Sequence, residues 1–109
     1  MLNIGVLGAG HLGKIHLSLW KEIAGVNVIG FYDTDGSKSK EVEQETGIRS
    51  FSSMHVLLEQ CDVIDIVPPT LTHYSLAAAA IKKSKHVFIE KPVTATVHEA
   101  EKLISLAHE

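Results

Sequence analysis

Short apolar runs alternate with helix-like segments along the whole chain, and this order limits the fold more than any other feature of the sequence. Five runs predict strands: Leu2–Leu7, Val26–Tyr32, Ile48–Phe51, Val63–Val67 and His86–Ile89. Five segments predict helices: His11–Ile23, Ser37–Thr46, Met54–Gln60, Thr72–Ser84 and Val97–Ala107. All strands but the third are almost continuously apolar, which is typical of a parallel sheet covered by helices on both faces. The order therefore predicts an α/β fold with a doubly wound parallel sheet of at least five strands.

Length and charge exclude several classes of protein. At 109 residues the chain has the length of one domain, and no linker-like stretch divides residues 1–109. Its formal net charge of −3 gives no basic face for a nucleic acid. The apolar runs are too short to span a bilayer, and the N-terminus lacks the pattern of a signal peptide. One cysteine, Cys61, excludes an intramolecular disulfide framework. We therefore expect a soluble cytoplasmic domain without nucleic-acid or membrane partners.

A glycine-rich segment follows the first predicted strand, and residues 8–13 match the G-x-G-x-x-G pattern of dinucleotide-binding loops. Its first glycine allows a tight turn, its second lets the backbone approach a pyrophosphate, and its third lets the helix pack closely on the strand. The helix start offers unpaired N–H groups and a positive dipole end to phosphates. The predicted cofactor-binding residues of this glycine loop are Gly8, Gly10, His11, Leu12 and Gly13. The strand–loop–helix context favours a Rossmann-type dinucleotide site over a plain turn.

Asp33 ends the second predicted strand, 20 residues after Gly13. A carboxylate at this distance binds the 2′-hydroxyl of the adenosine ribose and repels a 2′-phosphate, so the sequence favours NAD over NADP. Lys38 keeps NADP open as the less favoured cofactor. Because Asp33-Thr34-Asp35-Gly36 also has the composition of a turn, a purely structural role for Asp33 is the alternative.

The fifth predicted strand runs directly into Glu90-Lys91-Pro92. Ligands of open α/β sheets bind outside the carboxyl ends of the strands, so Glu90 and Lys91 are expected at the working edge. A lysine there can hydrogen-bond a substrate hydroxyl and assist its loss of a proton during hydride transfer. Without this context, Lys91 would be read as one more solvated loop lysine.

Several of these segments together resemble one known family. The glycine loop with His16, then Asp33, then residues 69–73 (Pro-Thr-Leu-Thr-His) and 85–92 (Lys-His-Val-Phe-Ile-Glu-Lys-Pro) resemble the Gfo/Idh/MocA oxidoreductases, which include glucose–fructose oxidoreductase and inositol dehydrogenase. The resemblance covers essentially the whole chain and implies a nicotinamide cofactor with a sugar, inositol or related polyol as substrate. It implies that Lys91 is the active-site lysine and that Glu90 lines the nicotinamide end. It also implies a cofactor-side loop containing Pro69, Thr70 and His73, although a first-turn helix residue without a ligand is an almost equal interpretation of His73.

The resemblance also implies what this chain lacks. Members of the family carry a C-terminal α/β domain that supplies most of the substrate pocket, and nothing in residues 1–109 corresponds to it. We therefore expect a cofactor domain, truncated before that second domain, that is inactive alone and can self-associate through the edge of its last strand. Two alternatives are a catalytically inactive NAD-binding module and, less favoured, a methyltransferase. The seven histidines show no metal-binding spacing, and Asp65, within an apolar strand, is interpreted as structural.

Overall fold

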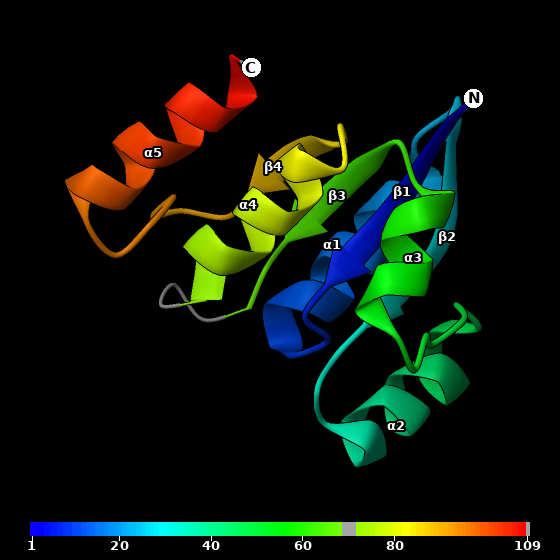
Figure 1. The fold of residues 1–109 in the computed structure, drawn as a ribbon. Helices are drawn as coiled ribbons and strands as arrows, with labels where there is room; N and C mark the ends of the chain where they lie inside the picture. Colours follow the sequence, from blue (N-terminus) through cyan, green and yellow to red (C-terminus); the bar gives the residue numbers. More distant parts are fainter. Residues whose placement is uncertain (69–71, 109) are drawn as a thin grey trace.

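In a computed structural model that describes residues 1–68 and 72–108, the chain forms a parallel sheet with helices on both faces (Figure 1). The described strands are β1 (Leu2–Leu7), β2 (Val26–Tyr32), β3 (Val63–Ile66) and β4 (His86–Ile89), in the order β2-β1-β3-β4. The helices are α1 (His11–Glu22), α2 (Gly36–Thr46), α3 (Met54–Gln60), α4 (His73–Lys82) and α5 (Val97–Ala107). All three strand pairs are parallel, as the apolar runs predict.

The predicted strand over Ile48–Phe51 is wrong, so the described sheet has four strands and not at least five. This segment makes a single parallel bridge, between Phe31 and Ser50. Ile48 is buried with the residues on one face of the sheet and Phe51 with those on the other. The segment therefore passes around the edge of β2 from one helical layer to the other, and only its middle runs beside the strand.

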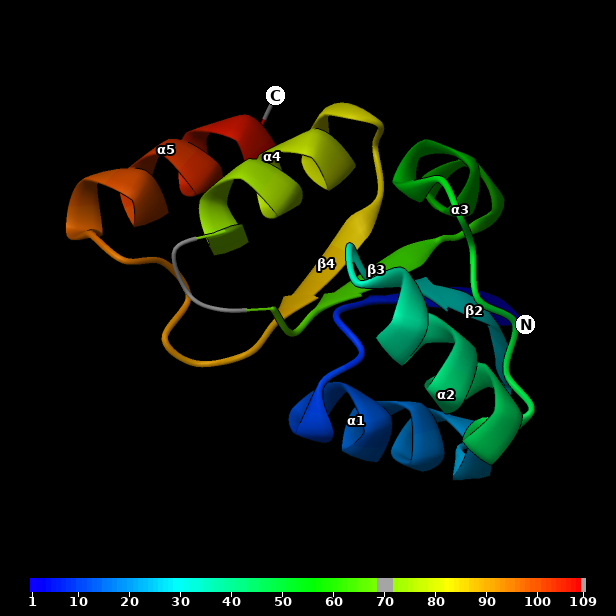
Figure 2. The same cartoon turned by 90° about the horizontal axis from the view of Figure 1, so that it is seen from below.

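The helices form two layers with a separate apolar core under each (Figure 2). On one face α1 and α2 cover the sheet through Leu17 and Val42, which pack with Val6 and Phe31. On the other face α3, α4 and α5 contribute residues to the larger cluster, and α5 packs against α4. Burial of both faces is the physical reason for the continuously apolar strands.

Several helix ends carry the capping residues expected at such positions. The Ser53 hydroxyl accepts a hydrogen bond from the Val56 N–H at the start of α3, and Thr96 accepts one from the Glu99 N–H at the start of α5. Gly47 ends α2 in the left-handed conformation, with φ of 72°. The Ser53 and Thr96 side chains thus satisfy N–H groups that have no partner inside the helix, and the left-handed Gly47 ends its helix through its backbone conformation.

The apolar stripe of α1 faces solvent instead of the sheet. Its members are Leu12, Ile15 and Leu19, with Ile23 just after the helix, and each is 41% to 56% exposed. The buried residues of α1 are Gly13 and Leu17, about 135° around the helix axis from the middle of the stripe. Because Gly13 has no side chain, this side of the helix approaches the sheet most closely. None of the helices that the model describes is both long and apolar enough to cross a membrane.

Candidate functional site

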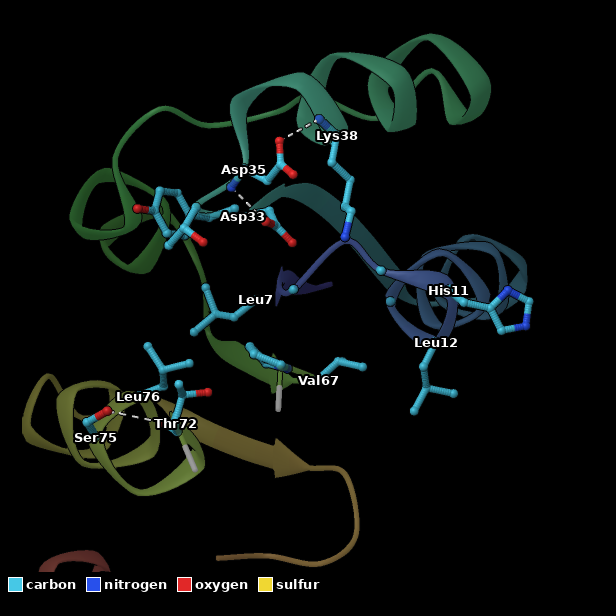
Figure 3. Close-up of a pocket in the computed structure, with 16 residues that line it drawn as sticks. Leu7, His11, Leu12, Asp33, Asp35, Lys38, Val67, Thr72, Ser75 and Leu76 are labelled. Carbon is cyan, nitrogen blue, oxygen red and sulfur yellow. Dashed lines mark hydrogen bonds between the residues drawn. The ribbon is translucent and has the colours of Figure 1, made fainter. Parts of the chain in front are cut away.

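The carboxyl ends of the parallel strands meet at one edge, and a cavity of about 730 Å³ opens there (Figure 3). The chain passes from β1 to β2 on one side and returns to β3 on the other, so the direction of winding reverses between β1 and β3. Ligands of open α/β sheets bind at such a reversal. The cavity is lined by Leu7, Gly8, Gly10, His11, Leu12, Gly13, Tyr32, Asp33, Thr34, Asp35, Lys38, Val67, Pro68, Thr72, Ser75 and Leu76.

The glycine loop has the geometry that the sequence predicts. Gly8 adopts φ of 98°, in the region that favours glycine, and its N–H donates to the carbonyl of Tyr32. A Cβ at Gly13 would lie 2.1 Å from the carbonyl oxygen of Gly8, so the start of α1 lies directly against the loop. A Cβ at Gly10 would have no atom within 4 Å. Gly10 therefore leaves open space where the loop borders the cavity.

The N-terminus of α1 points its backbone donors toward this space. Gly10 is the N-cap residue, and among the described residues no side chain caps the helix. The first N–H groups of a helix without a cap retain hydrogen-bonding capacity and a partial positive charge, which suit a phosphate. The ring of His11 points away from the cavity and the side chain is exposed, while Leu12 forms part of the wall (Figure 3).

Asp33 is bound to the glycine loop through its side chain. One carboxylate oxygen accepts a hydrogen bond from the Ala9 N–H at 2.7 Å, and the other accepts one from the Asp35 N–H at 2.8 Å. The carboxylate thus serves the turn and also borders the cavity. Lys38 borders the same side of the cavity, and its N–H donates to Asp35, which caps α2 (Figure 3).

His73 has a buried side chain that joins two loops. It is 2% exposed, and its Nε2 lies 2.6 Å from the carbonyl oxygen of Pro68. Its Nδ1 lies 2.9 Å from the carbonyl oxygen of Pro92 and 3.2 Å from that of Val93. The ring therefore ties the segment after β3 to the segment after β4. The two other residues predicted for this loop, Pro69 and Thr70, lie outside the described residues.

The structure places Glu90 and Lys91 at the end of β4, beside the cavity but outside the set of residues that line it. Lys91 is exposed, and its peptide bond to Pro92 is cis. The Glu90 carboxylate lies 3.0 Å from Nε2 of His16. The described residues thus bring the glycine loop and Asp33 into one cavity and leave the predicted active-site lysine in solvent.

A polar cluster that the sequence interpretation missed lies between α1 and the sheet. Asp65, fully buried on β3, accepts hydrogen bonds from Nε1 of Trp20 at 2.7 Å and lies 2.6 Å from Nδ1 of His16. Burial raises the pKa of Asp65, and the hydrogen bonds from Trp20 and His16 oppose that shift. The spacing of His16 and Trp20, one helical turn apart, was the available signal for a partner to Asp65.

Metal-ligand clusters are absent from the part of the chain that the model describes. Residues 1–68 and 72–108 hold no group of three or more His, Cys, Asp or Glu side chains that could bind a metal ion. Cys61 is buried, and its burial raises the pKa of the thiol to about 11. A buried thiol with so high a pKa carries little of the reactive thiolate at neutral pH.

Comparison with known proteins identifies similar sequences and folds. Residues 2–109 match the model of a protein family described as an oxidoreductase family with an NAD-binding Rossmann fold, Gfo/Idh/MocA. UDP-N-acetylglucosamine 3-dehydrogenase of Acidithiobacillus ferrooxidans is 37% identical over 99% of this chain and 34% of its own length. Myo-inositol 2-dehydrogenase of Thermotoga maritima is 29% identical over 94% of this chain and 32% of its own length.

Solved structures match equally well. A crystal structure of the Acidithiobacillus ferrooxidans enzyme superposes with a TM-score of 0.91 at 36% identity, over 98% of this chain and 35% of that one. A probable dehydrogenase from Thermotoga maritima has a TM-score of 0.91 at 29% identity, over 98% and 33% of the two chains. The chain therefore spans about a third of the length of these relatives. With the family model matched over almost every residue, the chain belongs to the Gfo/Idh/MocA oxidoreductases and forms their NAD-binding Rossmann domain.

Proposed function

We propose that this chain binds NAD(H), in preference to NADP(H), for an oxidoreductase that transfers hydride between the nicotinamide and a sugar, inositol or related polyol. The observation that carries this proposal is the position of the Asp33 carboxylate beside a cavity that also receives the uncapped N-terminus of α1. The substrate class is supported by the relatives, which are named as dehydrogenases of a nucleotide sugar and of myo-inositol.

Each end of the adenosine diphosphate part has a matching group in the cavity. The first N–H groups of α1 would donate to the pyrophosphate, and Gly10 leaves space for its close approach. Asp33 already accepts two backbone hydrogen bonds, and its oxygens retain lone pairs for a ribose hydroxyl. A 2′-phosphate would bring negative charge to the same carboxylate, with Lys38 as the compensating cation.

Lys91 is proposed as the active-site lysine, with Glu90 at the nicotinamide end. Both follow β4, whose carboxyl end lies at the same edge of the sheet as the cavity. The nicotinamide cofactor, when bound, supplies the hydride-transfer chemistry. The part of Lys91 is to hydrogen-bond the substrate oxygen and to receive its proton. Pro69 and Thr70 are proposed for the cofactor-side loop, and His73 for holding that loop against the segment after β4.

Cofactor choice tests this proposal. We expect the wild-type chain to bind NADH more tightly than NADPH, and Asp33→Ala to narrow the ratio of the two affinities by about 10- to 100-fold, the range for a hydrogen bond to a charged group. Titration followed by nicotinamide fluorescence measures both affinities. Glu41→Ala, an exposed carboxylate on α2, is the control and is expected to leave the ratio unchanged. Equal wild-type affinities, or tighter binding of NADPH, would contradict the assignment.

An NAD-binding module without chemistry is the alternative. One observation favours it, namely that Lys91 is exposed and outside the cavity wall among the described residues. Cofactor binding is expected under both functions, so that measurement does not separate them. An enzyme that carries this domain and loses turnover when Lys91 is replaced by Met, while NADH affinity persists, supports the catalytic function. Unchanged turnover in that variant would refute the assignment of Lys91, whereas a protein that carries this domain, binds NADH and turns over no sugar or polyol supports the module.

We further propose that β4 pairs with β4 of a second copy of the chain. This strand lies at an edge of the sheet, and Phe88 on it is 50% exposed. An apolar edge strand with free backbone groups favours pairing between molecules.

Sedimentation velocity at increasing protein concentration tests this pairing. The wild-type chain is expected to show a rising sedimentation coefficient, and Phe88→Lys is expected to suppress the rise by placing a charge at the edge. Val56→Lys, at a 42% exposed position on α3, adds the same charge elsewhere and should behave as wild type. A concentration-independent monomer would refute the pairing.

A further inference from the structure

We propose that His16 is a positioning residue that holds Glu90, and with it the segment around Lys91, at the nicotinamide end of the site. The inference rests on the proposed function, because it assigns a task in cofactor binding to a side chain outside the cavity. Its foundation is a histidine whose two ring nitrogens each face a carboxylate from a different strand.

The bridge runs from the interior to the edge of the sheet. Nδ1 of His16 lies 2.6 Å from Oδ2 of Asp65, whose side chain is 0% exposed, and Nε2 lies 3.0 Å from Oε2 of Glu90, whose side chain is 29% exposed. Carboxylate oxygens only accept when ionised, so a bridge between two ionised carboxylates requires a proton on both ring nitrogens. Each contact is then a charge-assisted hydrogen bond, which is stronger than a neutral one.

The inner end of this bridge is fixed. Asp65 lies in β3 between β1 and β4, and the same Oδ2 accepts the hydrogen bond from Trp20, one helical turn beyond His16. Phe88 packs edge-on against both rings, with centroid distances of 6.3 Å to His16 and 5.9 Å to Trp20. The imidazole is therefore held by Asp65 and by the Phe88 ring before it reaches Glu90.

The outer end of the bridge, Glu90, directly precedes Lys91, the proposed active-site lysine. The Glu90 N–H donates to the carbonyl of Ile66, which is the last backbone bond between β3 and β4 before Lys91. From the opposite face of the sheet, His73 contacts the carbonyl oxygens of Pro92 and Val93. Residues 90–93 are thus held on one face through the Glu90 side chain and on the other through their backbone. Releasing Glu90 removes the hold on the α1 face.

Two ligands distinguish a positioning role from a purely structural one. NADH occupies the nicotinamide end, whereas ADP-ribose carries the adenosine and pyrophosphate without a nicotinamide. Loss of the bridge should therefore weaken NADH binding by about 3- to 10-fold, the range for one hydrogen bond, and leave ADP-ribose affinity within about twofold. A general loss of folded protein would lower both affinities by the same factor.

Calorimetric titration of the 109-residue chain with NADH and with ADP-ribose makes the comparison. The variants are His16→Gln, which cannot bridge two carboxylates, and Glu90→Gln, which keeps the Asp65–His16 contact and tests the bridge if His16→Gln fails to fold. His86→Gln, an exposed histidine at the start of β4, is the matched control and should bind both ligands as wild type does.

The possible results test the positioning role of His16 separately from the proposed function. Weaker NADH binding with unchanged ADP-ribose binding in His16→Gln, matched in size by Glu90→Gln, supports the positioning role of His16. Equal effects on both ligands, or no effect on either, in a wild-type background that binds both would overturn that role and leave the proposed function intact. A wild-type chain that binds neither ligand would overturn the proposed function itself.

Discussion

Gly13→Ala is expected to destabilise the domain by about 3 kcal/mol or more, because overpacking against backbone atoms cannot be relieved by a rotamer change. The new Cβ would lie 2.1 Å from the carbonyl oxygen of Gly8 and 2.8 Å from its carbonyl carbon. Either α1 or the end of β1 must move, and both of these elements contribute residues to the wall of the cavity. Urea denaturation followed by circular dichroism measures the loss of stability, and NADH titration of the folded fraction measures the loss of binding.

Two further glycine variants serve as controls for this experiment. Gly10→Ala should keep a stability within about 1 kcal/mol of wild type, since its Cβ meets nothing within 4 Å, and yet lose NADH affinity because that Cβ occupies the approach of the pyrophosphate. Gly36→Ala, at the exposed start of α2, should leave both properties unchanged or raise the stability by about 0.4–1 kcal/mol. A Gly13→Ala protein as stable as wild type would show that α1 does not need this close approach.

The second large effect concerns catalysis. The 109 residues alone are expected to bind NAD(H) and to oxidise no inositol or aldose above background. Orientation of the reactants contributes about 7–11 kcal/mol in favourable cases, which corresponds to a rate factor of about 10⁵ to 10⁸. In the described structure the glycine loop and Asp33 line the cavity, while Lys91 is exposed to water outside its wall. A solvated lysine does not provide the dry, oriented site that hydride transfer requires.

A screen of polyols with NAD, followed by absorbance of the reduced nicotinamide, tests this expectation. Binding of NADH by the same sample shows that the chain is folded and loaded. The myo-inositol 2-dehydrogenase of Thermotoga maritima, assayed in parallel, shows that the conditions permit turnover. Oxidation by the 109-residue chain at an ordinary dehydrogenase rate would refute the view that this domain supplies only the cofactor half of a site.

The parts of the fold that follow from local chemistry were predictable from the sequence. The four strands are almost continuously apolar and therefore need cover on both faces, which identifies a parallel sheet. Gly47 and Thr96 mark a helix end and a helix start because their conformational and hydrogen-bonding properties act over a few residues. The glycine loop and Asp33 belong to the same βαβ unit, and each follows one of its two strands. Their meeting at one cavity therefore also follows from the sequence.

Features that depend on distant packing were not predictable. Ile48–Phe51 has the composition of a strand, but its two large side chains belong to different cores on opposite faces of the sheet. The stripe along α1 has helical periodicity, yet the small residue Gly13 and not the stripe decides which side meets the sheet. Periodicity reports that one face of a helix is apolar and does not report what covers it.

The histidines illustrate the same limit at the site. Nothing local to His16 indicates a partner, because Asp65 lies 49 residues away in the chain. His73 contacts Pro68, five residues away, but also Pro92, 19 residues away. His16 meets Asp65 only when α1 packs on the sheet, and His73 meets Pro92 only when the ends of β3 and β4 align. A buried carboxylate in an apolar strand does imply a partner, and that requirement, together with the one-turn spacing of His16 and Trp20, was the available pointer to His16.

The dual bonding of Asp33 has a consequence for engineering and for the evolution of cofactor preference. Under the proposed role of Asp33, a change toward NADP would replace this carboxylate by a small or basic residue, but the same carboxylate accepts the Ala9 N–H and so fastens the glycine loop to the end of β2. The proposed cofactor preference and the attachment of the glycine loop both depend on the Asp33 side chain. A single substitution that switched the preference would therefore also loosen the glycine loop. Evolution or engineering toward NADP would first need a substitution that holds the glycine loop through a different contact.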